Sequence, residues 1–566
     1  MTDAQLRAQA RIDAETFLRD WAEYRMGYVE AELPNPMTRR LSQTCLADAG
    51  EGAKLLLSVD RDVASRAAAA LSSEDFRRFA DAIQTAILTG GRVLFSGCGS
   101  SGRLSMQLER SWRRAIADQI ALHPEAKKTL DAYLESVENI MTGGDFAVIR
   151  AAESFEDSPR MGRAQTKERK LTEKDVLVGV TATGETTSVL GTAAQALEDG
   201  AQVWMLVCTE PTPLKERMSR VREVFDHPRC SALVLPCGPM ALTGSTRMQS
   251  STFEQFAAAV ALETTLCAIL ERAGVRESCP APEAFGEAFY TLTGSLLGEK
   301  CISALREAIL AEQEVYEHGG LITMFSDEYL MDILTDTTER APTFSTPPFR
   351  SDAHRDQPPS WAFAKHPSLP TAEAWKACFL RAPHCIEWGK ETYAQLGFTE
   401  REIARIPDVG LAALEQFPVG CEPDAEREQS PCSRAIWIGT GSAPAAFREQ
   451  ASRYHSSAEL TSDGVGADFP ETKLHIFEHI ALKLLLNTLS TAAMARMGRI
   501  SGNWMTNLAL SNKKLVDRSA RIVSDLCGVS YETALEENYY SKFFLEQQNN
   551  TGSPVQETIR RLEEMK

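Results

Sequence analysis

A short apolar run, Val93–Phe95, leads directly into the glycine- and serine-rich segment Gly97–Leu104 (GCGSSGRL). The run has the length of a buried strand, and the residues that follow the glycines have helical spacing. Glycines at a strand-to-helix turn let backbone N–H groups approach an anion, and the helix N-terminus adds partial positive charge. A lone glycine motif is weak evidence, so the segment predicts either a phosphate-binding turn or an ordinary glycine-rich βα turn.

A second apolar strand and a hydroxyl-rich loop follow the same order. Val176–Val180 precedes Thr181–Ser188, and further strands are expected at 203–208 and 231–236. Strands that alternate with helices predict a parallel sheet covered on both faces, which is the α/β class. Ligands bind such sheets beyond the carboxyl ends of the strands, where these loops would meet.

Helical spacing surrounds this first predicted sheet. Residues 1–85 predict a helical arm that covers a sheet, with a helix start at Ser72–Asp75. Residues 103–134 predict one long helix, and a second helix is expected over 146–157.

The strand pattern restarts after segment 273–300, which we expect to be a connection. Leu321–Phe325 predicts a strand, but the following Asp327 and Glu328 would repel a phosphate. The proline-rich residues 343–372 predict a loop or an insertion.

Composition limits the classes of partner. The chain has 566 residues, too many for one core, and its formal net charge of -18 argues against non-specific binding to nucleic acid or an anionic membrane. The 13 cysteines include no CxxC pair, which is typical of reduced thiols in the cytosol. No secretory signal or membrane-spanning run is evident, so we expect a cytoplasmic protein, and we expect neither a cofactor nor a metal.

Three segments together resemble one protein family. They are Gly97–Leu104, Thr243–Met248, and Gly502–Met505 with Ser511–Arg518. In combination they resemble the sugar-isomerase (SIS) group, which contains bacterial N-acetylmuramic acid 6-phosphate etherase and animal glucokinase regulatory protein. The apparent second, degenerate module is more similar to the regulatory protein, because the etherase has one module in each chain.

This resemblance implies two SIS-type modules, each a parallel sheet flanked by helices, and a C-terminal helical lid. The expected divisions are an N-terminal helical arm (1–60), a first module with the phosphate loop (61–275), a second, degenerate module (276–495) and the lid (496–566). Two modules that pack together as an internal pseudo-dimer would be compatible with a monomer.

The resemblance and the loops predict one set of ligand-binding residues. Hydroxyls and loop N–H groups can hold a phosphate monoester without a metal, so most of the set comes from the loops. The predicted set is Gly99, Ser100, Ser101, Glu153, Glu156, Thr183, Thr186, Ser245, Thr246 and Lys483. For Thr181 and Thr187 the alternative is hydrogen bonding within loops and caps, and Arg247 would either pair with a carboxylate or bind the ligand.

The family resemblance also identifies the acid/base positions. Etherases of this family use two glutamates, and the position of the first is Ser111 in this chain. The second matches Glu156, which would be catalytic only if the protein is an enzyme and would otherwise hold sugar hydroxyls. The alternative for Glu153 and Glu156 is charge on a helix surface. For Glu339, in the matching stretch of the second module, a structural or dimer-mimicking role is expected.

Lys483 matches a lysine that, in the regulatory protein, reaches from the second module to the sugar phosphate. The alternative is a lysine whose ammonium extends to solvent from an apolar helix. His475 and His479 have a metal-type spacing, but chance placement on one helix face is the expected explanation.

The resemblance therefore implies a sugar-phosphate-binding regulator or sensor similar to glucokinase regulatory protein. Its ligand would be a hexose or amino-sugar phosphate, and a sugar kinase is the partner that family analogy implies. The alternatives are an etherase-type lyase, a sugar-phosphate isomerase, or a scaffold with an empty cleft.

Overall fold

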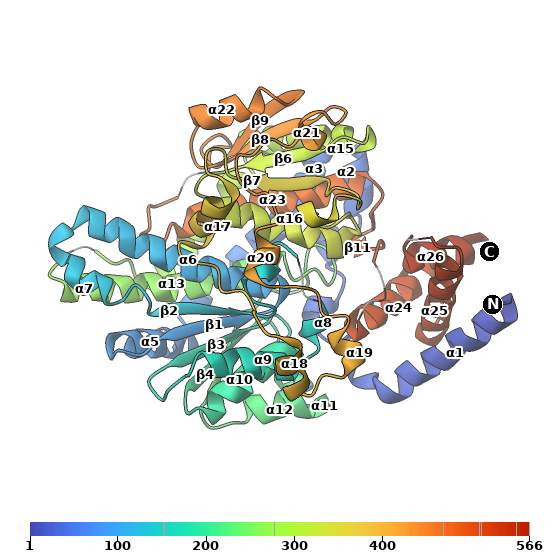
Figure 1. The fold of residues 1–566 in the computed structure, drawn as a ribbon, viewed down its shortest axis with the longest axis horizontal. Helices are drawn as coiled ribbons and strands as arrows, with labels where there is room; N and C mark the ends of the chain where they lie inside the picture. The colour runs from blue at the N-terminus through green and yellow to red at the C-terminus, as the bar shows by residue number, and fades with distance from the viewer. Residues whose placement is uncertain are drawn as a thin grey trace.

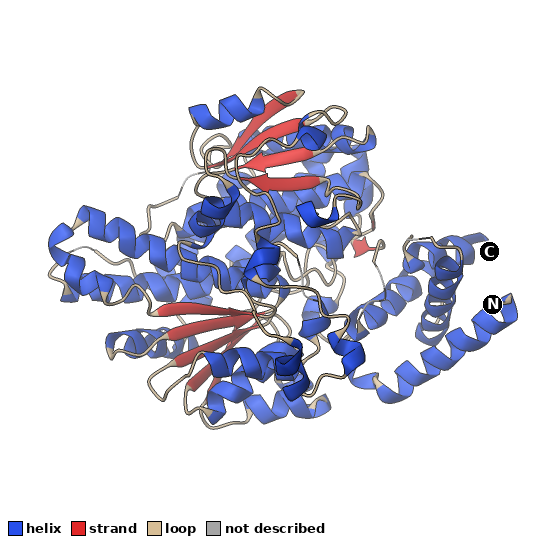
Figure 2. Ribbon diagram, in the orientation of Figure 1, coloured by secondary structure: helices blue, strands red, loops and turns tan. Residues whose placement is uncertain are grey.

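Two parallel sheets, each flanked by helices, form the body of the chain in a computed structural model (Figure 2). The structure describes residues 1–150, 153–276, 278–467, 469–508, 510, 512–550 and 552–564, and the side chains of Glu153 and Ser154 lie outside this description. The predicted α/β class with two parallel sheets is confirmed.

The first sheet has five parallel strands in the order β2-β1-β3-β4-β5. The strands are β1 (Val93–Gly97), β2 (Val137–Met141), β3 (Val176–Val180), β4 (Gln202–Val207) and β5 (Cys230–Val234). Its helices are α6 (Gly99–Leu122), α7 (Lys127–Asp131), α8 (Glu153–Glu156), α9 (Pro159–Glu168), α10 (Thr187–Glu198), α11 (Thr212–Arg217), α12 (Ser219–Phe225) and α13 (Gln249–Arg272), with 3₁₀ turns η4 (Pro124–Ala126) and η5 (Asp145–Val148). Because β1 and β3 are neighbours, the loops that follow them lie at the same edge, as predicted.

The predicted helix over 103–134 is wrong. α6 ends at Leu122 because Pro124 lacks a donor N–H and disfavours helical backbone at the residue before it. The strand β2 follows, and its sequence VENIM was missed since two of its five side chains are polar.

The second sheet has four parallel strands in the order β7-β6-β8-β9. They are β6 (Ile322–Phe325), β7 (Ala362–Lys365), β8 (Arg434–Gly439) and β9 (Ser456–Thr461). Its helices are α14 (Pro282–Leu296), α15 (Glu299–Glu317), α16 (Leu330–Phe344), α17 (Thr371–Phe379), α18 (Lys390–Gln395), α19 (Glu400–Ile403), α20 (Leu411–Leu414), α21 (Ala425–Glu428), α22 (Ala445–Ala451) and α23 (Ile476–Arg496), with η6 (Asp352–His354). The expected connection 273–300 is largely α14, and the expected loop 343–372 contains β7, so both expectations are corrected.

The chain termini build a helical lobe beside the modules. Its C-terminal part is the hairpin β10 (Ile500–Ser501) and β11 (Trp504–Met505), followed by α24 (Lys513–Cys527), α25 (Tyr531–Gln547) and α26 (Pro554–Glu564). Of the N-terminal helices, α1 (Asp3–Asp20) belongs to this lobe, and η1 (Ala22–Tyr24), η2 (Glu30–Glu32) and η3 (Pro36–Thr38) follow it. The next helices pack against the two modules instead: α2 (Leu41–Ala47), α3 (Ala49–Ala64), α4 (Ala67–Leu71) and α5 (Glu74–Leu88). α1 packs against α25, and the two ends of the chain lie near each other (Figure 1).

Local signals explain several of these boundaries. The predicted start at Ser72–Asp75 is confirmed, because the Ser73 hydroxyl accepts a hydrogen bond from the N–H of Phe76 at 3.1 Å and caps α5. α13 is long and apolar enough to cross a membrane, but 83% of its most apolar window is buried among neighbouring elements, so it is a core helix.

The second module contacts the first through a segment that contains α18–α20. Figure 1 shows this segment crossing in front of both modules. Tyr393 stacks against Phe155 with ring centroids 6.5 Å apart. Just before α18, the Arg381 guanidinium donates to both oxygens of Glu109 at 2.6 and 2.9 Å and also binds Asp145. All three side chains are nearly inaccessible to solvent, so this charge cluster ties the modules together.

We predict that Arg381→Ala will lower the free energy of unfolding by about 3–5 kcal/mol, because two buried carboxylates lose their common cation. The measurement is the midpoint of urea unfolding, followed by circular dichroism. Arg401→Ala is the matched control, since Arg401 is exposed on α19 in the same segment. Equal midpoints for the two variants would contradict a stabilising role for the cluster.

Candidate functional site

The turn between β1 and α6 leaves its backbone donors available. Gly99 has a φ of +56°, which favours glycine, and Cys98 provides no side-chain cap. A side chain at Gly97 would come within 2.5 Å of the Ser101 backbone, so the turn closes tightly only with glycine. The first N–H groups of α6 therefore have no intrahelical acceptor and present partial positive charge.

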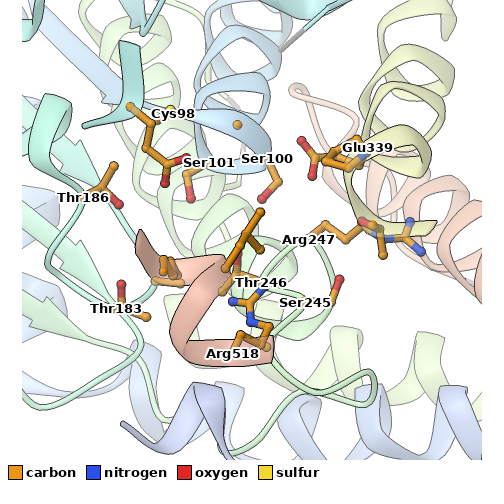
Figure 3. A pocket seen from close by; sticks show the side chains of 18 of the residues that line it. Cys98, Ser100, Ser101, Thr183, Thr186, Ser245, Thr246, Arg247, Glu339 and Arg518 are labelled. Carbon is orange, nitrogen blue, oxygen red and sulfur yellow. The ribbon is translucent and has the colours of Figure 1, made fainter. Parts of the chain in front are cut away.

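A cavity of about 170 Å³ lies in front of this turn (Figure 3). The structure brings most of the predicted ligand-binding residues into its wall. They are Gly99, Ser100, Ser101, Glu156, Thr183, Thr186, Ser245 and Thr246. Thr181 and Arg247 line it too, together with residues that were not predicted: Glu339, Asn512, Lys514 and Arg518.

The loop after β3 lies opposite the first turn and adds hydroxyl groups. The hydroxyls of Thr181 and Thr186 are 2.9 Å apart, and Thr183 donates to Glu185 at 3.5 Å. α10 begins at Thr187, so a second helix N-terminus lies at the end of this loop. Two helix N-termini and several hydroxyls thus serve one cavity, an arrangement that suits an anion.

A buried carboxyl group lies behind the first turn. The Ser101 hydroxyl donates to Glu254 at 3.5 Å, and Glu254 has no solvent exposure. Burial raises the pKa of Glu254 well above its usual value, although hydrogen bonds from Ser101 and Cys208 oppose the shift. A shift in this direction favours the neutral acid, which does not repel an anion in the cavity.

Two of the cations at the cavity are already paired with carboxylates. Arg247 binds Asp336 at 2.7 Å. Of the two alternatives for Arg247, pairing with a carboxylate is the one that its contacts in this structure match. Arg518 donates to the two oxygens of Glu32 at 3.1 and 2.6 Å.

Among Arg247, Arg518 and Lys514, the longest distance between a cation and its carboxylate partner is that of Lys514. Its ammonium lies 3.5 Å from Glu185. Burial acts to lower the pKa of Lys514, but the negative charges of Glu185, Glu32 and Glu156 outweigh it and the net pKa is raised. Lys514 is therefore held as a cation at the cavity wall.

The cavity contains one carboxylate from each module. Glu156 comes from α8 of the first module and Glu339 from α16 of the second. Glu339 forms an ion pair with Arg103, whose side chain has no solvent exposure. Ser111 is buried outside the cavity wall, and Glu109 is occupied by Arg381. The second carboxylate in the cavity thus comes from the second module, and the structural or dimer-mimicking role expected for Glu339 stays a prediction.

The two remaining predicted ligand contacts are Lys483 and Glu153. Lys483 is outside the cavity wall and donates to the carbonyl of Arg247 at 2.7 Å and to Asn487 at 3.1 Å. Burial, reinforced by the charge of Arg247, lowers the pKa of Lys483 to about 8. Glu153 begins α8, but its side chain lies outside the described residues. The roles of both remain predictions.

The two helix-face histidines have separate partners. His479 lies 2.9 Å from Asp332, and His475 lies 3.4 Å from Asp118. Within the described ranges, no group of His, Cys, Asp and Glu side chains could hold a metal ion.

Residues 77–197 match the family described as the glucokinase regulatory protein N-terminal SIS domain. This match identifies an SIS domain within the first module. An N-acetylmuramic acid 6-phosphate etherase from Bacillus pumilus is 32% identical over 221 residues, covering 39% of this chain and 63% of the etherase. The corresponding etherase from Vibrio campbellii is 34% identical over 175 residues, 31% of this chain and 49% of its own length. The chain thus spans between about half and just under two thirds of the length of these two relatives.

Solved structures give more distant matches. A tagatose-6-phosphate ketose/aldose isomerase from Escherichia coli has 10% identity and a TM-score of 0.39, over 82% of this chain and 95% of the isomerase. A glucosamine-6-phosphate deaminase from Thermotoga maritima has 12% identity and a TM-score of 0.36, over 79% of this chain and 96% of the deaminase.

Apart from Glu339, the wall residues missed by sequence reasoning lie at or near the start of α24. Asn512 caps this helix by accepting a hydrogen bond from the N–H of Leu515 at 2.8 Å, which leaves Lys514 in the first turn and next to the cavity. The segment Ser511–Arg518 was recognised only as a family signature. Its consecutive lysines at a helix start were the available signal for a cation near the site.

We predict that Glu32, which anchors α24, stabilises the fold in a pH-dependent manner. Despite its burial, the charges of Arg518 and Arg521 lower the pKa of Glu32 to about 2. A carboxyl group whose pKa is lower in the folded than in the unfolded state stabilises the fold at any pH above its unfolded-state pKa. This stabilisation is lost as the pH falls through the folded-state pKa, here between about pH 5 and 2. The shift corresponds to about 3 kcal/mol at neutral pH.

Urea midpoints of the parent protein and Glu32→Gln at pH 7 and at pH 3 measure this contribution. We expect the urea midpoint of Glu32→Gln to lie well below that of the parent protein at pH 7, and the difference between the two midpoints to be smaller at pH 3. Glu30→Gln is the control, because Glu30 is exposed in the same 3₁₀ turn. A difference that is independent of pH would show that the ion pairs do not carry the effect.

Proposed function

We propose that this chain binds a sugar phosphate in the cavity between its modules and acts as a regulator or sensor similar to glucokinase regulatory protein. The observation that carries the proposal is the meeting of two helix N-termini, several hydroxyls and Lys514 around one cavity. The ligand would be a hexose or amino-sugar phosphate.

The phosphate belongs at the first turn. Ser100 and Ser101 lie on one side of the cavity, and Thr183 and Thr186 lie on the other (Figure 3), while Gly99 also lines the wall. These groups donate hydrogen bonds to phosphate oxygens, and Lys514 adds a compact positive charge. A phosphate monoester needs no metal in such a site.

The sugar would lie between Glu156 and Glu339, which come from different modules. Carboxylates accept hydrogen bonds from sugar hydroxyls. A ligand that contacts both modules and α24 has different contacts in open and closed arrangements, so its binding shifts the balance between them. Such a shift would change the surface available to a partner, and a sugar kinase is the partner class that the resemblance implies.

We predict that a sugar phosphate will raise the thermal midpoint of the protein and that Lys514→Met will reduce the effect. At one hundred times its dissociation constant, a ligand stabilises the folded state by about 2.7 kcal/mol. Loss of the charge-assisted contact costs about 1.5–3 kcal/mol. The measurement is a thermal-shift titration with fructose 6-phosphate, glucosamine 6-phosphate and N-acetylmuramic acid 6-phosphate.

Lys513→Met is the matched control, because Lys513 is the adjacent lysine and lies 3.4 Å from the centre of the Trp21 ring. Ser101→Ala should abolish the shift, and Lys483→Met tests the lysine that the family resemblance selected. Absence of any shift with the whole panel would favour an empty scaffold. An unchanged shift in Ser101→Ala would place the phosphate elsewhere.

A second candidate is an etherase-type lyase, favoured by the two carboxylates in one cavity. Etherase chemistry removes a proton next to a carbonyl and protonates the leaving lactyl oxygen, and each step needs a positioned acid or base. Glu156 and Glu339 are the groups in the cavity wall that would perform these transfers. A sugar-phosphate isomerase would use the same carboxylates for proton transfer between neighbouring carbons.

The lyase and sensor proposals differ in lactate production. We expect the purified protein to release no lactate from N-acetylmuramic acid 6-phosphate, because Glu339 is fixed by Arg103 and Ser111 replaces the first-module glutamate. Coupled detection of lactate is the measurement. Lactate release that Glu156→Gln and Glu339→Gln each reduce by about 100-fold or more would establish the lyase instead.

A further inference from the structure

A groove larger than the cavity opens beside it, with a volume of about 920 Å³. One wall is formed by η5 of the first module, and the other by α16 and by segments of the second module around η6 and α20. We call it the insertion groove and define it by Ile149, Thr338, Phe349, Ala412 and Phe417. Figure 1 shows α20 in front of the space between the two sheets.

The insertion groove and the phosphate-side cavity are contiguous. Pro342 and Leu515 line both. Adjacent residues of α16 line the two spaces, because Thr338 lies in the wall of the groove and Glu339 lies in the wall of the cavity. A substituent on a sugar held beside Glu339 therefore has a direct route into the groove.

The groove has aromatic walls and positive charge. Phe146 and Phe417 meet edge to face with centroids 5.9 Å apart. Arg150 and Arg405 line the groove, and neither forms an ion pair within the described part of the chain. The carboxylate of Asp408 accepts a hydrogen bond from the N–H of Gly410 at 3.0 Å, so it is already engaged.

Polar side chains alternate with these apolar ones. Gln357 and Gln416 line the groove, and both are exposed. Amide side chains donate and accept hydrogen bonds, as peptide groups require. Two guanidinium groups without carboxylate partners favour an occupant that carries carboxylates. A purely hydrocarbon chain would leave these polar groups unused.

We propose that the ligand of this protein is a sugar phosphate with an extended substituent that contains amide groups and carboxylates, and that this substituent occupies the insertion groove. This inference rests on the proposed function, since it places the sugar phosphate in the adjoining cavity. A short peptide linked to the sugar through an acyl group has the required chemistry.

The test compares two ligands that share one sugar phosphate. The first is N-acetylmuramic acid 6-phosphate, and the second is the same compound with an L-alanyl-D-glutamyl dipeptide in amide linkage to its lactyl carboxyl group. Calorimetric titration gives the dissociation constants, and turnover is excluded in the same samples by measuring the leaving group, which is lactate from the first ligand and the lactyl dipeptide from the second. We predict at least about tenfold tighter binding of the dipeptide compound.

Variants in the groove locate the source of this preference. Ala412→Trp fills the groove, and Arg150→Ala and Arg405→Ala each remove a cation. We expect each of them to reduce the tenfold preference while leaving the affinity for the shorter ligand unchanged. Ala404→Trp is the matched control, because Ala404 is exposed near α19 and is absent from the groove wall.

The two proposals fail in different ways. Binding of the shorter ligand with no gain from the dipeptide would overturn the groove proposal and leave the proposed function standing. A preference that persists in Ala412→Trp and in both arginine variants would also overturn it. Binding of neither ligand would contradict both proposals.

Discussion

The buried guanidinium of Arg103 connects the two modules at the site. It lies in the first turns of α6, directly after the glycine turn, and is shielded completely from solvent. It donates to the carbonyls of Ala147 and Val148 at 2.7 and 3.1 Å and forms an ion pair with Glu339 of the second module. Burial lowers the pKa of Arg103, and Glu339 opposes that shift. A buried cation needs such a carboxylate, so the turn depends on the second module.

This dependence explains the arrangement of the site. Without the second module, Arg103 would lose its carboxylate and the cavity would lose the wall that contains Glu339 and Pro342. The Arg381 cluster holds the same two modules together at a second point. In the second module Asp327 and Glu328 follow β6 where a glycine turn follows β1, and the contribution of this module to the cavity is the wall that contains Glu339.

The glycine turn and part of each sheet were predictable because their signals are local. Apolar runs identify β1 and β3, and the hydroxyl-rich loops follow them directly in sequence. β2, β7 and β9 are short and carry polar residues such as Glu138, Lys365 and Glu459, so periodicity alone does not reveal them. Their partner strands, distant in sequence, supply the missing information.

The cations and carboxylates of the site also depend on contacts between residues that are distant in sequence. Family resemblance selected Lys483, yet the apolar helix α23 keeps its ammonium buried against the carbonyl of Arg247. Lys514 reaches the cavity because Asn512 and Glu32 fix the start and the docking of α24, two features encoded far apart in the chain. Counting along α6 found Ser111 where a glutamate was expected, and no count along one helix can find Glu339 on another module. A cavity assembled from two modules and a terminal helix is therefore predictable in its glycine turn, where the residues are consecutive, and at Glu156, which the resemblance selects. The fold is needed to bring Glu339 and Lys514 into the same wall.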